Sequence, residues 1–217
     1  MPTTTSRQDL RSAATRRALL DATVDCLVED GYAGTTGPAI ARRAGLSRGA
    51  QLHHFGTRDQ LVVAAVEHLG QLRLAEVRTS LEELQANDRG AANTGEVALE
   101  LLAAALSGPL YAATLELWVA ARSNASLRSE LVPAERRVRA ELESVCRDFV
   151  TQDPPSIQAT LDLLLGQGVS GLFEDDHTSR RNAREHWHSL LTRHAGANAP
   201  ESPTDEVPPD TTPANHR

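Results

Sequence analysis

Two helix starts in close succession, with a glycine stop between them, constrain this chain more than any other feature. Thr36, or alternatively Thr35, has the side-chain oxygen that caps a helix start, and Pro38 then falls in the first turn, where its missing N–H costs nothing. Gly45 tolerates the left-handed conformation of a helix end, and Ser47 is the next cap. The pattern predicts two short helices around a tight turn, which is the geometry of a helix-turn-helix.

The second of these helices has few apolar residues and several long polar ones, so it is better suited to a DNA groove than to a core. Arg48 can bind a phosphate or a guanine edge, and Gln51 can pair with adenine through two hydrogen bonds. Imidazoles can donate to phosphate oxygens, and small side chains let the backbone approach a duplex closely. We therefore expect these residues at DNA: Arg48, Gly49, Ala50, Gln51, His53 and His54.

The flanking segments fit the same arrangement. Apolar residues recur at helical spacing over 15–30, and Gly31 ends that helix. Thr57 followed by Gln60 is the signature of a capping box at the start of a long helix. Arg58, beside that helix N-terminus, is expected to bind a phosphate.

Residues 12–72 resemble the DNA-binding domain of tetracycline-repressor (TetR) family regulators. The resemblance implies that Thr35 or Thr36 and Arg58 lie at the DNA together with the polar residues of the second helix. The family commonly has Tyr where Leu52 stands, and we expect Leu52 to pack inward. The matching segments are Gly31-Tyr32, Thr35-Thr36, Ile40-Ala41, Ala44-Gly45-Leu46-Ser47, Arg48-Gly49, Phe55 and Thr57-Arg58.

The formal net charge of −7 is unevenly distributed along the chain. Residues 1–60 hold eight Arg against six Asp and Glu, whereas the remainder holds fourteen Arg against twenty-three acidic residues. A slightly basic head on an acidic body suits site-specific DNA binding with weak non-specific affinity.

The rest of the chain has helical periodicity and no strand alternation, so we expect an all-α fold of about nine helices. The three-helix helix-turn-helix domain would span 12–72, and a helical ligand-binding and dimerisation domain would span 73–195. A break is expected from Asn124 to Pro133. The polar tails 1–11 and 196–217 are expected to lack structure.

The last two helices carry apolar stripes and three glycines that suggest close helix–helix approach. Pairing with their symmetry mates would make the four-helix dimer bundle that the TetR resemblance implies, and packing within one chain is the alternative. The expected interface residues are Leu161, Leu165, Gly168, Leu172, Trp187, Leu190 and Leu191.

A small-molecule pocket is expected between the helices of such a bundle. Tyr111, Leu115, Trp118 and Arg122 lie within about three turns of one expected helix and could form one wall. The alternative assigns the aromatic rings to the core and the arginine to the surface.

Catalytic and metal chemistry have no support in the sequence. There is no metal-ligand spacing, phosphate-binding loop or nucleophile elbow. Cys26 and Cys146 are isolated and are expected to be small buried hydrophobes. We therefore expect no enzyme activity, no cofactor and no metal.

With the helix-turn-helix pattern, the TetR resemblance implies a homodimeric regulator that binds a palindromic DNA operator, and specifically a repressor released by a small molecule. The alternatives are an activator or a protein-responsive regulator of the same build, and a helical ligand-binding protein without a DNA function. No apolar run is long enough for a transmembrane helix and no leader segment is visible, so a cytoplasmic location with no membrane partner is expected.

Overall fold

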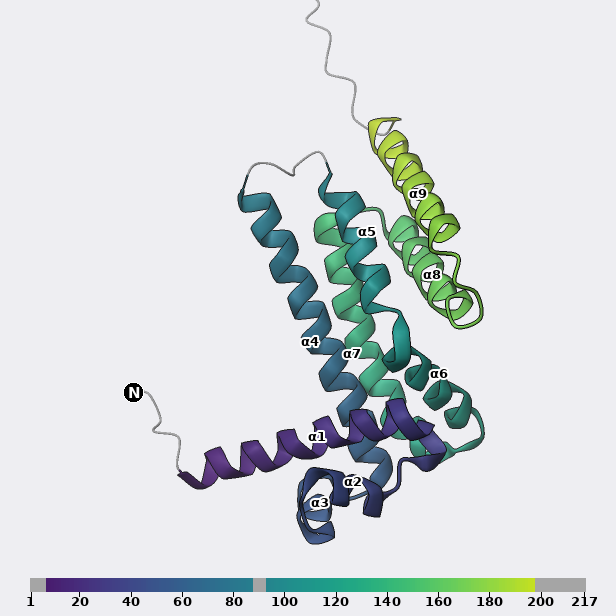
Figure 1. Ribbon diagram of the computed structural model, residues 1–217. Coiled ribbons are helices and arrows are strands. Elements are labelled where there is room, and N and C mark those ends of the chain that lie inside the picture. The colour runs from purple at the N-terminus through teal and green to yellow at the C-terminus, as the bar shows by residue number, and fades with distance from the viewer. Residues whose placement is uncertain (1–6, 88–92, 198–217) are drawn as a thin grey trace, which may run out of the picture.

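The computed structural model describes residues 7–87 and 93–197, and within these ranges the chain forms nine helices and no strand (Figure 1). The expected all-α fold is confirmed. The helices are α1 Arg7–Gly34, α2 Gly37–Ala44, α3 Arg48–Phe55, α4 Arg58–Ala86, α5 Thr94–Ala105, α6 Gly108–Ser123, α7 Ala125–Phe149, α8 Pro154–Ser170 and α9 His177–Ala197.

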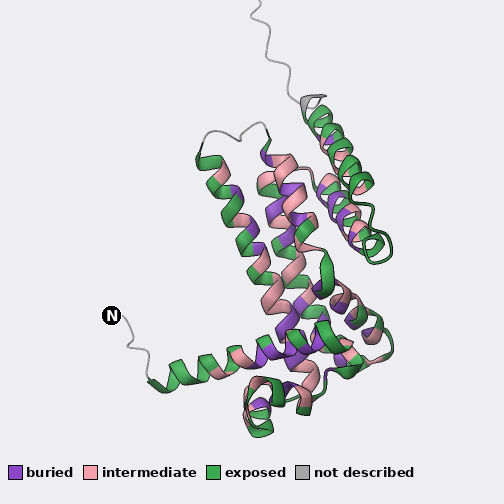
Figure 2. Ribbon diagram, viewed as in Figure 1, coloured by how far each residue is buried: buried purple, intermediate pink, exposed green. Residues whose placement is uncertain are grey.

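Helix α4 connects the two ends of the molecule. Figure 1 shows α1, α2 and α3 grouped at one end, with α4 rising from them alongside α7 and with α8 and α9 at the far end. Each successive part of α4 buries apolar side chains in a different cluster. Leu61 packs in the three-helix head, Val63 packs against α6 and α7, and Leu81 packs against α5, α7 and α8. Figure 2 shows the buried residues concentrated along these contacts.

The helix caps of the head form as predicted. The Thr36 hydroxyl accepts a hydrogen bond from the Ala39 N–H at 3.3 Å, which confirms Thr36 as the cap of α2. Gly45 ends α2 in the left-handed conformation, with φ of 65°. Ser47 caps α3. The capping box is complete, because Thr57 accepts from the Gln60 N–H and the Gln60 side chain accepts from the Thr57 N–H, each at 3.1 Å.

Two expected helix boundaries were wrong. Helix α1 begins at Arg7, so 7–11 is helical, and its regular path bends at Gly31, where φ is 67°, before ending at Gly34. The break expected from Asn124 to Pro133 is confined to Asn124, which caps α7 through a hydrogen bond from the Leu127 N–H at 3.1 Å. Pro133 lies inside α7. Burial of apolar side chains on both sides of it offsets the hydrogen bond that proline cannot make. The tail residues 1–6 and 198–217 lie outside the described residues.

Part of the expected dimer interface is buried within one chain, which corrects that expectation. Leu161 is 1% exposed and Leu191 is 7% exposed. A Cβ on Gly168 would collide with the Leu106 carbonyl oxygen and lie 2.6 Å from the Tyr111 ring, so this glycine serves an intramolecular contact. Periodicity finds the buried face of a helix but does not tell whether its own chain or a copy covers that face.

The other expected interface residues have mixed surroundings. The half-buried Trp187 donates its indole N–H to Thr160 within the chain, at 2.8 Å, and the Leu165 carbonyl accepts from the Tyr111 hydroxyl. Leu172 and Leu190 are exposed, and a role for them in dimerisation stays a prediction.

The two cysteines, Cys26 and Cys146, are buried and not disulfide-bonded, as expected of small buried hydrophobes. Among the described helices, none alone has the length and apolar content to cross a membrane. Only α5 and α6 together reach that length and composition, and they are bent by 65° at their junction.

Candidate nucleic-acid interface and ligand pocket

Helix α3 lies at the outer end of the head and presents several of the expected residues to solvent (Figure 1). Arg48, Gly49 and His53 are exposed, and Ala50 and His54 are half-buried. The His53 and His54 rings meet edge to face with centroids 5.3 Å apart. The exposed side therefore combines a guanidinium, a backbone without a side chain and an imidazole.

Gln51 and Leu52 face opposite to expectation. Gln51 is 3% exposed, and its amide packs over the start of α2, where a Cβ on Gly37 would lie 3.3 Å from Nε2. Leu52 is 48% exposed. Successive residues of a helix point in different directions, and α3 packs against α2 through position 51. Gln51 therefore lies over Gly37, and Leu52, the next residue, faces solvent. The expectation that Gln51 projects toward a base is corrected: here it packs between the two helices.

The two threonines before α2, Thr35 and Thr36, have different roles. Thr35 is fully buried and donates its hydroxyl to the Gly31 carbonyl at 2.7 Å, so it is not available at the surface. Thr36 is exposed as the cap of α2. Of the two expected candidates, only Thr36 lies where a partner can reach it.

Arg58 supports the scaffold instead of projecting freely for a phosphate, which corrects a second expectation. Its Nε donates to the Thr35 carbonyl at 2.5 Å, and Nη2 donates to the Tyr32 carbonyl. The guanidinium lies 4.0 Å over the Tyr32 ring, whose hydroxyl donates to Asp59 at 3.0 Å. The last carbonyls of a helix have no partner within that helix, and here the cation satisfies them at the end of α1.

A carboxylate from the body reaches the same turn of the chain. Glu116 on α6 accepts a hydrogen bond from the Tyr32 N–H at 2.7 Å, beside the bend at Gly31. A second link joins Gln60 on α4 to Glu130 on α7 at 3.1 Å. Sequence reasoning missed both links, because they join residues far apart in the chain and no local pattern marks them.

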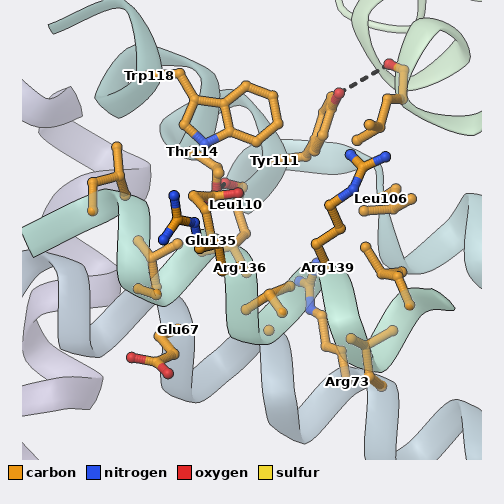
Figure 3. A pocket seen from close by; sticks show the side chains of 18 of the residues that line it. Glu67, Arg73, Leu106, Leu110, Tyr111, Thr114, Trp118, Glu135, Arg136 and Arg139 are labelled. Carbon is orange, nitrogen blue, oxygen red and sulfur yellow. Dashed lines mark hydrogen bonds between the residues drawn. The ribbon is translucent and has the colours of Figure 1, made fainter. Parts of the chain in front are cut away.

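A cavity of about 300 Å³ lies between α4, α6 and α7 and extends toward α5 and α8 (Figure 3). Tyr111 and Trp118 line it as expected, with Thr114 between them on α6. Leu115 and Arg122 do not line it, and Arg122 is exposed on the surface. The expectation for these two is corrected, because the face of α6 toward the cavity passes through position 114 and leaves 115 to one side.

The polar groups of the cavity come from helices that sequence reasoning did not connect. Glu135 on α7 lines it, and burial raises the pKa of this carboxyl, an effect that the neighbouring Trp118 indole N–H partly opposes. Among the described residues, the buried Trp118 Nε1 has no hydrogen-bond partner of normal geometry. Burial, reinforced by the Glu135 charge, raises the pKa of Tyr111. In the ranges that the structure describes, no cluster of His, Cys, Asp and Glu is arranged to hold a metal ion.

The head matches a known family model. Residues 19–65 match the model described as bacterial regulatory proteins, tetR family. The chain is 31% identical over 140 residues to an uncharacterized HTH-type transcriptional regulator of Mycobacterium tuberculosis, covering 64% of this chain and 70% of that protein. It is 32% identical over 159 residues to the HTH-type transcriptional regulator BetI of Paraburkholderia phytofirmans, covering 73% and 79%.

Solved structures share the fold over most of the chain. The multidrug binding protein EbrR complexed with imidazole has a TM-score of 0.63 at 23% identity, covering 81% of this chain and 94% of that one. A TetR family member from Streptomyces coelicolor, SCO1917, has a TM-score of 0.61 at 23% identity, covering 82% and 96%. With the capped helix-turn-helix, the long connecting helix and these relatives, the chain belongs to the TetR family of DNA-binding transcriptional regulators.

Proposed function

We propose that the protein is a ligand-responsive repressor that binds a palindromic operator as a homodimer. The observation that carries the proposal is the course of α4. Its first turn packs Leu61 into the head, and further along Val63, Val66 and Gly70 line the cavity. A ligand in the cavity contacts the same helix that positions the head. It can drive release from DNA only if it favours an orientation of α4 that DNA does not accept.

The proposed reading surface lies within 12–72 and comprises Thr36, Arg48, Gly49, Ala50, His53 and His54. Arg48 is the residue best placed to bind a guanine edge or a phosphate. Leu52, turned outward, joins this surface as an apolar group suited to a thymine methyl. Gln51 acts indirectly by holding α3 on α2.

Residues 73–195 are proposed as the ligand-binding and dimerisation body. Apolar side chains exposed on α8 and α9 and between them support pairing there, because burying them against a second copy removes them from water. These are Val169, Leu172, Phe173 and Leu190. Pairing must hold the two copies of α3 about 34–36 Å apart to enter successive major grooves.

Small organic molecules are the proposed effectors. EbrR, which shares the fold, has been crystallised with imidazole, proflavin, malachite green and ethidium. The cavity of about 300 Å³ and its largely apolar lining support an effector of comparable chemistry here. Because its target is chromosomal DNA, the proposed place of action is the cytoplasm.

A gel shift with the DNA upstream of the protein's own gene tests the proposal. We expect one dimer per palindromic site and a weaker shifted band in Arg48→Ala. The matched control is Glu141→Gln, an exposed position on α7 away from the head, which should bind as the wild type does. Failure of the wild-type protein to bind any upstream segment would contradict the proposal.

A transcriptional reporter determines the sign of regulation. We expect the purified protein to lower transcription from the bound promoter in vitro and a cognate effector to restore it. Transcription that rises on binding would identify an activator and overturn the repressor assignment.

A further inference from the structure

The cavity holds the Glu135 carboxyl group beside two aromatic rings, those of Trp118 and Tyr111 (Figure 3). Glu135 lies beside Trp118 and close enough to Tyr111 for its charge to influence that phenol. The two rings are nearly perpendicular, with an interplanar angle of 85° and centroids 6.4 Å apart. The Tyr111 hydroxyl donates to the Leu165 carbonyl at 2.9 Å, which fixes the orientation of its ring.

No cation of the described residues forms an ion pair with Glu135. The other carboxylate of the lining, Glu67, is already paired with Arg137 at 2.5 Å. Arg139 pairs with Glu143 at 3.1 Å and also donates to Gln158. Figure 3 shows the Glu135 carboxyl directed toward Thr114 and Trp118, away from Arg139 and Arg73.

The remaining arginines of the lining, Arg73 and Arg136, form no ion pair with Glu135 either. Arg136 is exposed, and Arg73 donates to the Ala105 carbonyl at 3.4 Å. Neither contributes to the pKa of Glu135, which burial raises and only the Trp118 indole lowers. The buried end of the cavity therefore holds a carboxyl without a compensating positive charge.

A carboxylate beside two aromatic rings favours a positively charged guest. The faces of indole and phenol rings attract cations. A partly buried carboxylate has lost stabilising interactions with water, and a nearby positive charge compensates for that loss. An anionic guest would instead meet repulsion from Glu135 at this end.

We propose that the cavity selects organic cations with a compact aromatic or alkyl body, with Glu135 as counter-charge and Trp118 and Tyr111 as the walls around the cationic group. This inference rests on the proposed effector site and specifies its ligand class. The largely apolar lining contributed by α4, α6 and α7 accepts the body of the guest.

Isothermal titration calorimetry with three single-ring probes tests the charge preference. The probes are benzyltrimethylammonium, its neutral carbon isostere neopentylbenzene, and the anion benzenesulfonate. We expect the cation to bind the wild-type protein at least about 10-fold more tightly than either of the others. Glu135→Gln should weaken the cation by about 10- to 100-fold and leave the neutral isostere unchanged. Glu141→Gln, exposed on the same helix, is the matched control and should alter neither affinity.

Tighter binding of the anion, equal binding of the neutral isostere, or a cation affinity that Glu135→Gln does not reduce would each overturn the inference, as would the absence of binding by any probe. Cooperative thermal unfolding of the Glu135→Gln protein establishes that the variant is folded. These titrations contain no DNA. A negative titration therefore does not affect the operator-binding result, and a failure of operator binding does not affect the titration result.

Discussion

Removing Arg58 should loosen the attachment of the start of α4 to the end of α1 without removing a phosphate contact. The guanidinium donates to the Tyr32 and Thr35 carbonyls and stacks on the Tyr32 ring. Arg58→Ala leaves these two carbonyls at the end of α1 without their donor. The loss should therefore appear in the stability of the fold before it appears in the electrostatics of DNA binding.

The size of the effect follows from the contacts. A hydrogen bond from a charged donor contributes about 1.5–3 kcal/mol, and the ring contact adds about 0.5–1 kcal/mol. The Arg58 side chain is 29% exposed, so water replaces part of what is lost. We expect the free energy of unfolding to fall by about 2 kcal/mol and Tm by about 4–8 °C. Arg58→Lys should recover little, because an ammonium lacks the planar fork that serves two carbonyls.

Thermal unfolding and the salt dependence of DNA binding together decide the matter. Arg42→Ala, at an exposed position in the last turn of α2, is the stability control and should change the free energy of unfolding by less than about 0.5 kcal/mol. Arg58→Ala should leave the slope of log K against log salt unchanged, because it removes no phosphate contact. An unchanged Tm with a reduced slope for Arg58→Ala would refute this reasoning and restore the phosphate contact.

Three further outcomes are expected. Gly168→Ala should destabilise the fold by about 1–3 kcal/mol because its Cβ has no room, whereas Gly166→Ala in the same helix, with open space around it, should stabilise by up to about 1 kcal/mol; equal denaturant midpoints would contradict this. Cys26 and Cys146 should resist a thiol reagent until the chain unfolds, since both are buried and burial raises the pKa of Cys146 to about 12; rapid labelling of the native protein would contradict it. Burial raises the folded-state pKa of Glu135 above its unfolded-state pKa. Below the unfolded-state pKa this carboxyl therefore costs the fold no stability, and the free energy of unfolding should fall as the pH rises from the unfolded-state pKa to the folded-state pKa. Glu135→Gln should flatten this part of the stability profile measured by denaturant unfolding, and an unaltered profile would contradict the assignment.

Local chemistry made the head predictable from sequence. Caps and stops act within three or four residues, so Thr36, Gly45, Ser47 and the Thr57–Gln60 pair could be identified before any tertiary contact was known. The same local reasoning misplaced the break near Pro133, because it could not weigh a single proline against the burial of the surrounding helix faces.

Side-chain direction and long-range partners were not predictable in this way. Gln51 is buried and Leu52 is exposed, the reverse of the expectation, because α3 packs against α2 at Gly37. This direction depends on how the two helices pack, which no local pattern specifies. The guanidinium of Arg58 lies over the ring of Tyr32, and these two residues precede and follow the helix-turn-helix in the chain, so no local pattern marks their contact. Glu135 lines the cavity because α7 packs against α6, and no motif in its own segment marks it as a ligand-binding residue.

Protection of guanine N7 atoms from dimethyl sulfate tests the central claim most directly, because this reagent probes the major groove that α3 is proposed to enter. On the bound upstream DNA, the wild-type protein should protect guanines in two half-sites on one face of the duplex, centred about 34–36 Å apart. Arg48→Ala should abolish the protection at its guanine in both half-sites, with the control Glu141→Gln giving the wild-type pattern. Protection at a single site, or a wild-type pattern that persists in Arg48→Ala, would contradict the account.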